Sequence, residues 1–536
     1  MSRVLIITSA AYAESELQAE FGRLPPAFLP IGNRRLFVHQ HRELQDGATR
    51  IILSLPDDFV PNPVDVALLA ELGIEPVHVP AGLSLGQSIV YVINVTASAG
   101  GPVSILHGDT LLRGLDRAAH DAVSVSTTPA SYEWGGVAVE QGRVVPHPPA
   151  APPPAGERAV LSGYFAFAEA ALLVQAITRA GGSFLHGLHQ YGRERPLRPL
   201  EATEWLDFGH ANTYHQSRGR VTTERAFNEL RTTPRQVVKS ARNAAKIVAE
   251  ARWFEGLPPP LRAFTPAFLG TRETANGPGY ALEYLYLPTL ADLYVFGSLS
   301  AGAWERVFGA CDEFLTACAA FPAPAEAVHQ AGALFGEKAQ QRLDDFAAAS
   351  GISPDAPCRF NGQALPSLRR MADLAASAIP PADPARHLRL VHGDFCFSNI
   401  LYDARANLVR VIDPRGTAAD GGMTPYGDLR YDLGKLYHSV VGRYDHILAG
   451  YFRLTGAGPL DLGLELPDGP AQREIEALFL RTGLGGLRPA EAASHAVCVL
   501  LFLSMLPLHA DDPRRQRALL ANAMRLFTGL EAARAA

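Results

Sequence analysis

Short apolar runs, separated by longer mixed stretches, dominate the first part of the chain. The runs at residues 4–8, 51–54 and 103–106 are almost wholly apolar, which is typical of strands buried on both faces of a parallel sheet. Stretches between them, such as residues 64–72, have helical character. Strands and helices in alternation predict an α/β domain with a doubly wound sheet, and such sheets bind ligands at their carboxyl edge.

The second part of the chain has a different pattern. Residues 408–412 form a strand-like run, and Asn407 before them is a turn residue, so we expect a hairpin. The longest apolar run, residues 496–508, contains Ser504 and Pro507 and is too short to span a bilayer. This run therefore indicates a core helix.

Length and composition bound the organisation and the class of function. A chain of 536 residues is long enough for two or three cores, and we expect two domains, residues 1–218 and 219–536, joined near residues 216–220. The net charge of -6 with scattered Lys and Arg gives no basic stripe, so we expect neither nucleic-acid binding nor membrane anchoring. The five cysteines lack paired metal spacing, which indicates reduced thiols. We expect a cytoplasmic protein without a signal peptide, and an oligomer is possible.

Two carboxylates and an amide have the spacing that phosphoryl transfer requires. Asp394 follows His392 and Gly393 directly. Asn399 lies five residues after Asp394, and Asp413 ends the strand-like run. Transfer from Mg·ATP needs a carboxylate that faces the acceptor hydroxyl and hard oxygen ligands for Mg²⁺. The spacing therefore predicts Asp394 as the catalytic residue, and Asn399 and Asp413 as the metal ligands.

These residues also carry a family resemblance. Residues 390–394 and Asn399, followed by residues 411–413, resemble the catalytic and metal-binding loops of the aminoglycoside phosphotransferase and choline kinase family. The resemblance implies a bilobal α+β kinase-like domain that uses ATP and Mg²⁺. It also implies that Asp432, in a segment similar to the family's Tyr-Asp-Leu helix start, caps a helix and braces the catalytic loop.

The same resemblance assigns residues that bind ATP. Lys239 is expected to contact the ATP phosphates, and Glu250 on a helix is expected to be its ion-pair partner. Residues 280–285 resemble the hinge between the lobes, where the backbone of Glu283 and Leu285 would meet adenine. The glycine-rich loop of protein kinases is not present before Lys239, so the way in which the first hairpin holds the phosphates stays open.

Residues near the catalytic loop support two kinds of acceptor. An aromatic cage for a quaternary ammonium is offered by Tyr426, Tyr431 and Tyr437. Polar groups that bind hydroxyls or a phosphate are offered by Arg415, Asp420 and Asp428. Because Arg415 follows the metal ligand Asp413 by two residues and repels a cation, we favour a polar or anionic acceptor.

Five segments of the first domain resemble motifs of the sugar nucleotidyltransferases, in the order of that family. The segments are residues 28–32, 83–88, 106–111, 162–167 and 205–210. The resemblance implies that Gly86 and Gln87 contact the nucleotide base, that Asp109 and Asp207 hold a metal ion, and that Gly163 contacts the substrate. The domain would then use a second NTP, with CTP as one candidate.

Two parts of the nucleotidyltransferase pattern are missing. Residues 8–13 stand in place of the glycine-rich loop, and we expect Ser9 and backbone amides there to contact phosphates at a helix start. Residues 25–27 stand in place of the motif that carries a lysine. The candidate substitutes for this lysine are Arg23, Arg34 and Arg35.

The two resemblances together predict consecutive reactions. ATP would phosphorylate a small alcohol (a sugar, polyol or amino alcohol), and the first domain would join the phosphate to a nucleotide with release of pyrophosphate. Such pairs of domains resemble the enzymes that activate choline, related head groups or sugars for bacterial surface polysaccharide (capsule) and lipopolysaccharide. The alternative is a small-molecule kinase whose first domain binds a ligand without catalysis and regulates or scaffolds the kinase.

Overall fold

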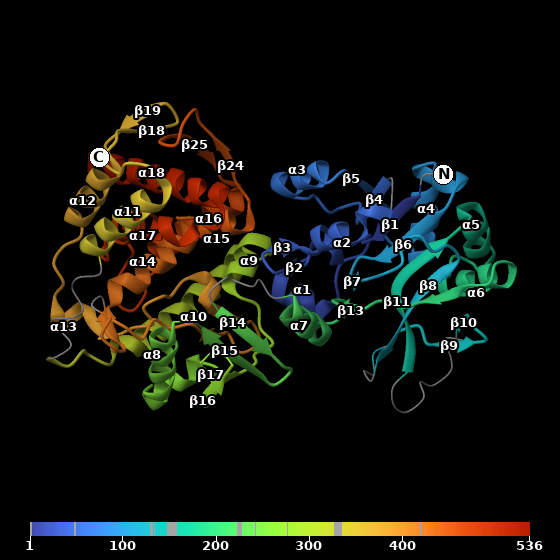
Figure 1. Ribbon diagram of the computed structural model, residues 1–536, viewed down its shortest axis with the longest axis horizontal. Helices are drawn as coiled ribbons and strands as arrows, with labels where there is room; N and C mark the ends of the chain where they lie inside the picture. The colour runs from blue at the N-terminus through green and yellow to red at the C-terminus, as the bar shows by residue number, and fades with distance from the viewer. Residues whose placement is uncertain are drawn as a thin grey trace. The chain divides into compact units, whose positions relative to one another are not determined.

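The computed structural model describes residues 3–47, 50–128, 132, 134–146, 158–221, 228–241, 243–275, 277–325, 335–418 and 421–535. The chain divides into two compact units, Met1–Thr222 and Thr223–Ala536 (Figure 1). The join expected near residues 216–220 lies in helix α7 (Ala211–Arg220), at the end of the first unit.

A seven-stranded sheet forms the centre of the first unit (Figure 1). Its strands lie in the order β12 (Arg198–Leu200), β8 (Ala122–Thr128), β11 (Arg158–Phe167), β6 (Val103–His107), β1 (Val4–Thr8), β4 (Arg50–Pro56) and β5 (Ile74–Val79). The neighbours β6, β1, β4 and β5 pair in parallel, whereas β11 runs antiparallel to β6 and β8. The three apolar runs therefore correspond to β1, β4 and β6 of this parallel part, whereas β5 was not predicted.

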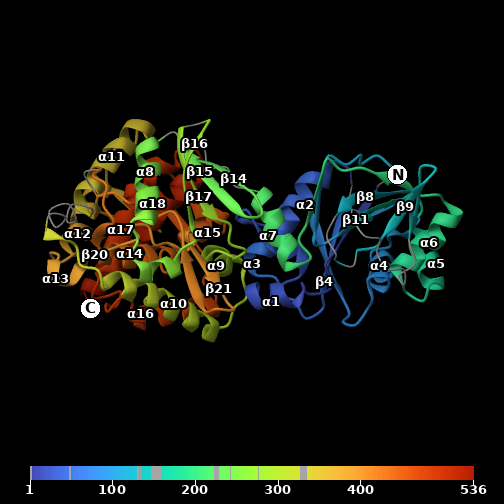
Figure 2. The ribbon, with the colours of Figure 1, turned by 90° about the horizontal axis from the view of Figure 1, so that it is seen from below.

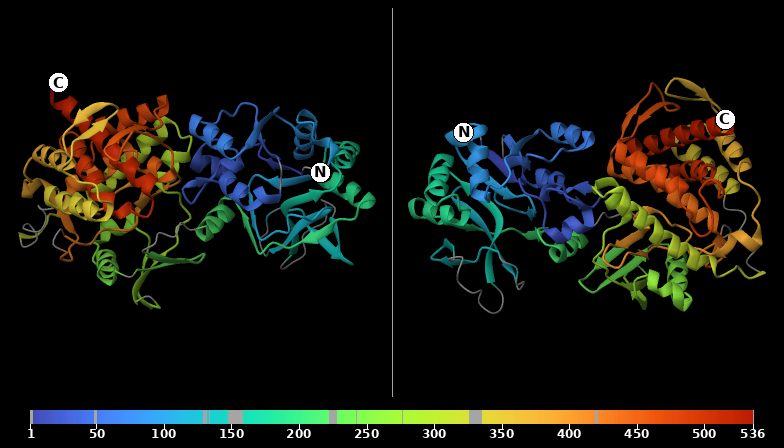
Figure 3. Two further views of the ribbon diagram at one scale, coloured as in Figure 1. Left: turned by 45° about the horizontal axis from the view of Figure 1, so that its top comes forward. Right: turned by 180° about the vertical axis from the view of Figure 1, so that it is seen from behind.

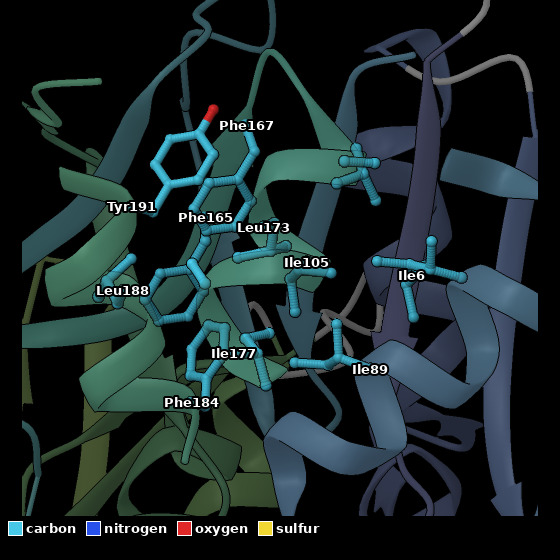
Figure 4. Packing of buried hydrophobic residues seen from close by; sticks show 14 of the residues in the cluster. Ile6, Ile89, Ile105, Phe165, Phe167, Leu173, Ile177, Phe184, Leu188 and Tyr191 are labelled. Atoms are coloured by element: carbon cyan, nitrogen blue, oxygen red, sulfur yellow. The ribbon is translucent and has the colours of Figure 1, made fainter. Parts of the chain in front are cut away.

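Helices cover both faces of this sheet. Successive residues of β1 point to opposite faces, and both sets are apolar, so each face needs a layer of helices to bury it. Val4 and Ile6 belong to a buried cluster with residues of α4, α5 and α6, which Figure 4 shows. Leu5 and Ile7 belong to a second cluster with residues of α2 and α3. The helices of the unit are α1 (Ser15–Phe21), α2 (Leu36–Leu44), α3 (Pro63–Glu71), α4 (Leu85–Val95), α5 (Ala170–Arg179), α6 (Phe184–Glu194) and α7. This arrangement is the doubly wound fold that the sequence predicts.

Three two-stranded ribbons complete the first unit. They are β2 (Pro30–Ile31) with β3 (Arg34–Arg35), β7 (Thr110–Arg113) with β13 (Glu204–Asp207), and β9 (Val137–Glu140) with β10 (Arg143–Pro146). The β7–β13 ribbon brings the start of the last motif, residues 205–207, back to the segment that follows β6.

The second unit begins with a small antiparallel sheet. Its strands lie in the order β14 (Asn228–Thr232), β15 (Gln236–Ala241), β17 (Gly277–Glu283) and β16 (Phe268–Thr274). Helix α8 (Ala244–Glu255) packs on this sheet (Figure 2). Asn243 caps the helix, because its side chain accepts the N–H of Lys246. This part corresponds to the smaller lobe expected of a kinase-like domain.

The larger lobe is mainly helical. Its helices are α9 (Leu290–Phe296), α10 (Ala301–Ala319), α11 (Gly336–Ser350), α12 (Leu368–Ser377), α13 (Pro384–His387), α14 (Leu429–Val440), α15 (Tyr444–Ala449), α16 (Pro470–Arg481), α17 (Ser494–Met505) and α18 (Pro513–Ala535). Its paired strands are β20 (Leu388–Leu390) with β23 (Tyr426–Asp428), β21 (Ile400–Asp403) with β22 (Leu408–Val411), and the sheet of β18 (Cys358–Phe360), β19 (Gln363–Leu365), β24 (Arg453–Thr455) and β25 (Asp461–Glu465).

The apolar run near the C-terminus forms the core helix of this lobe. Helix α17 is buried along most of its length and packs against both α14 and α18, which are drawn in orange and red in Figure 3. Throughout the described part of the chain, helices that combine the length and apolar character needed to cross a membrane are absent.

Candidate active sites

The loop that follows β20 is held in a tight turn by a buried carboxylate. Gly393 has a φ of 76°, and a Cβ there would lie 2.8 Å from the Cβ of Arg415, so the turn requires glycine. The N–H groups of His392 and Gly393 each donate to Asp432 over 2.8 Å. Asp432 therefore braces the loop as expected, but it does not cap the helix. The N-cap of α14 is Asp428, which accepts an N–H of the first turn.

Asp394 is fixed by an amide on one side and an ammonium group on the other. Nδ2 of Asn399 donates to the backbone oxygen of Asp394 over 2.9 Å and to its Oδ2 over 3.0 Å. Nζ of Lys435 lies 2.7 Å from Oδ1 of Asp394. Burial raises the pKa of Asp394, but the positive charge of Lys435 outweighs burial and holds this pKa below its ordinary value. Asp394 is therefore an ionised, oriented carboxylate.

A buried ion-pair network joins the small sheet, α8 and the end of the β21–β22 hairpin. Nζ of Lys239 lies 2.8 Å from Oε2 of Glu250 and 2.9 Å from Oδ1 of Asp413. The hydroxyl of Tyr280 donates to Glu250 over 2.7 Å. Burial lowers the pKa of Lys239, but Asp413 and Glu250 raise it above its ordinary value, so Lys239 is fully charged. The Lys239–Glu250 pair that the resemblance implies is thus present.

The two residues predicted as metal ligands flank the β21–β22 hairpin. The N–H of Ile412 donates to the carbonyl of Asn399 over 3.0 Å, which brings Asp413 to the side of Asn399. Asp413 has a φ of 58°, a left-handed conformation that is uncommon for aspartate and typical of functional sites. Because Nδ2 of Asn399 faces Asp394, Oδ1 is the amide atom that can bind a cation.

Asn399 and Asp413 form a small set of protein ligands, of the kind that Mg²⁺ uses. Among the described residues there is no group of three His, Cys, Asp or Glu side chains that could hold a metal ion. Mg²⁺ typically keeps several waters and takes its other ligands from one or two protein oxygens and the nucleotide phosphates. Asn399 and Asp413 offer such a pair of oxygens, so the residues fit Mg²⁺ bound together with ATP.

Helix α8 is fixed against the catalytic loop. Nε1 of Trp253 donates to the carbonyl of Val391 over 2.9 Å. Gly416 has a φ of 64°, and a Cβ there would lie 2.4 Å from the carbonyl oxygen of Ala249. The loop after β22 therefore touches the backbone of α8, and the helix that carries Glu250 is held by two separate contacts.

The expected hinge begins inside strand β17. The N–H of Glu283 donates to the carbonyl of Ala267 over 2.9 Å, and a side-chain oxygen of Glu283 accepts the N–H of Ala267 over 3.3 Å. The N–H of Glu283 is therefore used within the sheet and cannot bind adenine. Leu285 comes after the end of the strand, and its contact with adenine stays a prediction.

Of the two polar residues expected to bind the acceptor, Asp428 is occupied by another residue of the protein, whereas Arg415 lies beside Tyr431. Asp428 is buried, and its two carboxylate oxygens lie 2.6 to 3.1 Å from the guanidinium nitrogens of Arg430. Asp428 is therefore a capping and ion-pairing residue, and the expectation that it binds acceptor hydroxyls is corrected. Nη2 of Arg415 donates to the hydroxyl of Tyr431 over 2.6 Å, and Cζ of Arg415 lies 4.4 Å from the centroid of that ring.

Two of the three tyrosines expected to form a cage for a quaternary ammonium are engaged in other contacts. The ring of Tyr431 already carries the guanidinium of Arg415. The ring of Tyr437 is buried and stacks on His495, with 5.3 Å between the ring centroids. Asp420, the remaining polar candidate, lies outside the described residues.

A cavity of about 630 Å³ opens at the carboxyl edge of the sheet in the first unit. The predicted residues that line it are Gly86, Gln87, Asp109, Gly163 and Asp207. Such an edge is where doubly wound sheets bind their ligands. The cavity therefore gathers residues from four of the five motifs that the sequence singles out.

Asp109 and Asp207 are brought together by the β7–β13 ribbon, in which Asp207 pairs with Thr110. A Cβ on Gly209 would lie 2.7 Å from Oδ2 of Asp109 and 3.6 Å from Oδ1 of Asp207. Burial and the charge of Asp207 raise the pKa of Asp109. A divalent cation between two such carboxylates stabilises their ionised forms, so the pair fits the metal role that the resemblance implies.

Two glycines allow close backbone approach at this cavity. A Cβ on Gly86 would lie 2.4 Å from the carbonyl oxygen of Gly182, and Gly163 has a φ of 94°. Gln87 forms a capping box with Ser84 at the start of α4, in which Oε1 of Gln87 accepts the N–H of Ser84 over 2.8 Å. The amide oxygen of Gln87 is thus engaged, and its contact with a base stays a prediction.

Ser9 does not face the cavity. It is buried, its hydroxyl oxygen accepts the N–H of Ala27 over 3.0 Å, and its own N–H donates to the hydroxyl of Ser54 over 3.0 Å. These bonds connect the loop after β1 to neighbouring segments. The expected contact between Ser9 and phosphate is therefore corrected, because both of its polar groups are used inside the protein.

Two of the three expected substitutes for the missing lysine, Arg23 and Arg35, are also engaged elsewhere. Arg35 is buried and its Nη2 lies 2.7 Å from Oδ2 of Asp65. Arg23 is exposed, lies over the ring of Tyr12 and is 3.2 Å from Asp58. Among the described residues, neither these arginines nor any other Lys or Arg side chain lines the cavity.

Sequence reasoning missed Lys435, which contacts the carboxylate of Asp394. Lys435 lies three residues after Asp432 on α14, so both side chains are on one face of the helix. That spacing was the available signal. Cys396 in the same loop is buried, and burial raises its pKa to about 12, so its thiol is protonated and unreactive at neutral pH.

Comparison with known families identifies the second unit. Residues 209–464 match the family model of the phosphotransferase enzyme family. The C-terminal region is a phosphotransferase domain, and the chain is an enzyme of the transferase class. The resemblance that the catalytic-loop residues carry is thereby confirmed. The chain matches no curated protein.

Solved structures give matches of low identity to both regions. The crystal structure of HddC from Yersinia pseudotuberculosis is 16% identical, with a TM-score of 0.31, and the match covers 41% of this chain and 99% of that one. The inositol-1-phosphate CTP transferase from T. maritima is 14% identical, with a TM-score of 0.31 and coverages of 41% and 96%. The GDP complex of aminoglycoside 2'-phosphotransferase-IIIa is 14% identical, with a TM-score of 0.36 and coverages of 57% and 91%.

Proposed function

We propose that this chain catalyses two consecutive reactions. The second unit transfers the γ-phosphate of ATP to a small alcohol, and the first unit joins the phosphorylated alcohol to a nucleotide with release of pyrophosphate. The observation that carries the proposal is the convergence of Lys239, Asp394, Asn399 and Asp413 in one site. The acceptor class in view is a sugar, polyol or amino alcohol for surface polysaccharide, and CTP is the first nucleotide to test.

In the kinase step each residue has a defined task. Asp394 orients the acceptor hydroxyl and accepts its proton. The hydroxyl oxygen forms the new bond to the γ-phosphorus, while the bond between this phosphorus and the oxygen that bridges to the β-phosphate breaks and ADP leaves. Lys239 neutralises charge on the phosphates of ATP. Asn399 and Asp413 hold Mg²⁺, which supplies charge neutralisation on the transferred group. ATP and other nucleotides are cytoplasmic substrates, and we place the enzyme there.

In the nucleotidyl step two anions must meet. The phosphate of the alcohol attacks the α-phosphorus of the NTP, and the bond to the β-phosphate breaks to release pyrophosphate. Asp109 and Asp207 hold the divalent cation that reduces repulsion between the two groups. Gly86 and Gly163 line the cavity, and the absence of a Cβ at these positions lets Gly182 and Thr110 pack against them.

A pair of variants of the full chain separates the two steps. Asp394→Asn should lose ADP release from ATP and an alcohol, but should still release pyrophosphate from an NTP and a phosphorylated alcohol. Asp109→Ala should show the opposite pattern. Pyrophosphate release from none of the phosphorylated alcohols, with CTP or the other NTPs, would remove the second half of the proposal.

A second candidate function has its own observation in support. Lys or Arg is absent from the lining of the first cavity over the described residues, and Ser9 and Arg35 are used inside the protein. This favours a first unit that binds a nucleotide or a phosphorylated ligand and regulates the kinase without catalysis. Calorimetry decides between the two candidates: nucleotide binding without turnover, unchanged in Asp109→Ala, would favour the binding module.

A further inference from the structure

We infer that the alcohol accepted by the second unit carries an anionic group, a phosphate or a carboxylate, in the same molecule as the hydroxyl. This inference rests on the proposed kinase function of that unit. It comes from three cations that surround Tyr431 beside the catalytic Asp394. They belong to three elements: Lys338 to the first turn of α11, Arg415 to the loop after β22, and Lys435 to α14.

Arg415 supplies the best-defined of these charges. Its Nη2 donates to the hydroxyl of Tyr431 over 2.6 Å, and its Cζ lies 4.4 Å from the ring centroid. Nη1 is buried and has no hydrogen-bond partner among the described residues. A buried guanidinium N–H without an acceptor is costly. The aromatic contact fixes the orientation of Arg415, so Nη1 is ready to donate to an incoming anion.

Lys435 lies one turn after Tyr431 on α14, and Lys338 lies in the first turn of α11, whose start contacts the same ring. Phe335, at the start of α11, packs on the Tyr431 ring with 5.9 Å between the ring centroids, and Lys338 follows one turn later. Burial and the positive charges of Arg415 and Lys435 lower the pKa of Lys338. Burial raises the pKa of Tyr431, but Arg415, Lys435 and Lys338 outweigh it and bring the pKa below its ordinary value.

The carboxylates nearby do not balance these charges. Asp394 is bonded to Lys435 and Asn399, and Asp432 accepts the two N–H groups of the catalytic loop. Within the described residues, neither Lys338 nor Arg415 has a carboxylate at ion-pair distance. Burial lowers the pKa of Arg415, but the charges of Asp394 and Asp432 raise it from a longer distance. A direct anionic partner for Lys338 and Arg415 is missing among the described residues, and an anionic substrate group would supply one.

The composition of the chain singles out the same place. Lys and Arg total 48, and only four of these are lysine: Lys239, Lys246, Lys338 and Lys435. Three of the four belong to the ATP and acceptor sites described here. Lysine offers a compact ammonium that meets an anion as a point charge, whereas arginine needs room for a planar fork. The rare lysines therefore lie where small, close contacts to anions are required.

The positive charges of Lys338 and Arg415 also argue against cationic and neutral acceptors. A choline-like or polyamine acceptor would place a cation within reach of Lys338 and Arg415, where repulsion opposes binding. A neutral sugar would leave Nη1 of Arg415 unbonded. A second role for Lys435, in contacting the γ-phosphate, is compatible with its bond to Asp394. Lys338 is therefore the residue that tests the acceptor, since it makes no contact with Asp394.

The experiment measures ADP release by the full chain with matched alcohols. The panel contains glucose 6-phosphate and glycerol 3-phosphate, gluconate and glucuronate, glucose and glycerol, and choline and ethanolamine. We expect transfer to members of the phosphate or the carboxylate group, and the group that accepts identifies the anion. In Lys338→Met the KM for that acceptor should rise about 10- to 100-fold, the loss expected for one charged hydrogen bond, while the KM for ATP is unchanged.

Two controls make the result specific. Lys338→Arg, which keeps the charge, should recover most of the affinity. Arg342→Met removes a cation one turn further along α11 that is 3.5 Å from Asp345, and it should leave the acceptor KM unchanged. Transfer to the neutral or cationic alcohols alone, or an anionic acceptor whose KM ignores Lys338→Met, would overturn the inference. Transfer to no member of the panel would instead count against the proposed kinase function.

Discussion

Nζ of Lys239 and Oδ1 of Asp413 lie 2.9 Å apart, so the lysine expected to hold the ATP phosphates is ion-paired with the expected metal ligand. Each of the two charges satisfies the other before Mg·ATP binds. The bound state needs the same lysine on a phosphate and the same carboxylate on Mg²⁺. Binding of Mg·ATP therefore breaks the Lys239–Asp413 ion pair and replaces it with two contacts, one from Lys239 to a phosphate and one from Asp413 to Mg²⁺.

The first prediction concerns Asp413. In Asp413→Asn the metal loses its anionic ligand, and we expect productive Mg·ATP binding to be lost, with the KM for Mg·ATP raised at least about 30-fold. Calorimetric titration with Mg·ADP measures the binding directly. Asp468→Asn changes an exposed carboxylate of the same unit that pairs with Arg473, and it should behave as wild type. Wild-type affinity in Asp413→Asn would remove this residue from the metal site.

The second prediction separates orientation of the acceptor from binding of ATP. Asp394→Asn should reduce kcat by a factor on the order of a hundred or more, which is the contribution typical of a positioned acid-base group. Mg·ADP binding should stay within about twofold of wild type, because Lys239, Asn399 and Asp413 are untouched. Rapid-quench kinetics establish that chemistry limits the rate. An unchanged rate under those conditions would show that Asp394 does not face the acceptor.

The third prediction concerns pH and the neutral state of His392. Its Nδ1 accepts the N–H of Asp394 over 3.2 Å, and its Nε2 lies 2.9 Å from the carbonyl of Ile412. Burial lowers the pKa of His392 to about 4, so the stability it contributes is complete above about pH 6.5 and is lost as pH falls through 4. The difference corresponds to about 2 to 3 kcal/mol by pH 4.5.

Urea unfolding at pH 7 and pH 4.5 tests this prediction. The free energy of unfolding of the second unit should fall more steeply with decreasing pH in the wild type than in His392→Gln, which carries no titrating group at this position. Other buried histidines remain in both proteins, so the comparison isolates His392. Equal pH dependence in the two proteins would contradict the assignment.

The fourth prediction concerns close packing at the first cavity. A Cβ on Gly86 would lie 2.4 Å from the carbonyl oxygen of Gly182 and 2.9 Å from the N atom of Phe184, and both neighbours are backbone atoms that cannot rotate away. We expect Gly86→Ala to cost about 1 to 3 kcal/mol of stability and to weaken nucleotide binding at least tenfold. Gly100→Ala, where a Cβ meets open space, is the matched control. Nucleotide binding that Gly86→Ala leaves intact would place the ligand elsewhere.

Local patterns predicted much of the fold and part of the site. The apolar run that became β1 and the turn at Asn407 follow from the chain's own periodicity, and Asp394, Asn399 and Asp413 are close enough in sequence for spacing to bring them together. Helix α17 likewise follows from its apolar composition. The centre of the doubly wound sheet was predictable because β1, β4 and β6 are each marked by a separate apolar run.

Pairings between distant residues were not predictable in the same way. Arg35 was expected to contact a nucleotide, but it forms a buried ion pair with Asp65. Asp428 was expected to contact the acceptor, but it forms a buried ion pair with Arg430. A buried charge requires such a partner, and only the tertiary structure determines which one it is. Ser9 is similarly used to join its loop to the segment of Ala27. Lys338 reaches the acceptor site from a helix that no catalytic motif contains. Composition and sequence spacing do not indicate which distant residues come into contact in the fold.

The two contacts that hold α8, from Trp253 to Val391 and from Ala249 to Gly416, have a consequence for the energetics of turnover. They place Glu250 beside Lys239 before nucleotide arrives. The loss of conformational freedom that accompanies assembly of this ion pair is therefore incurred once, when the chain folds, and not in each catalytic cycle. Tight packing of one helix thus leaves more of the intrinsic binding energy of ATP for aligning the reacting groups.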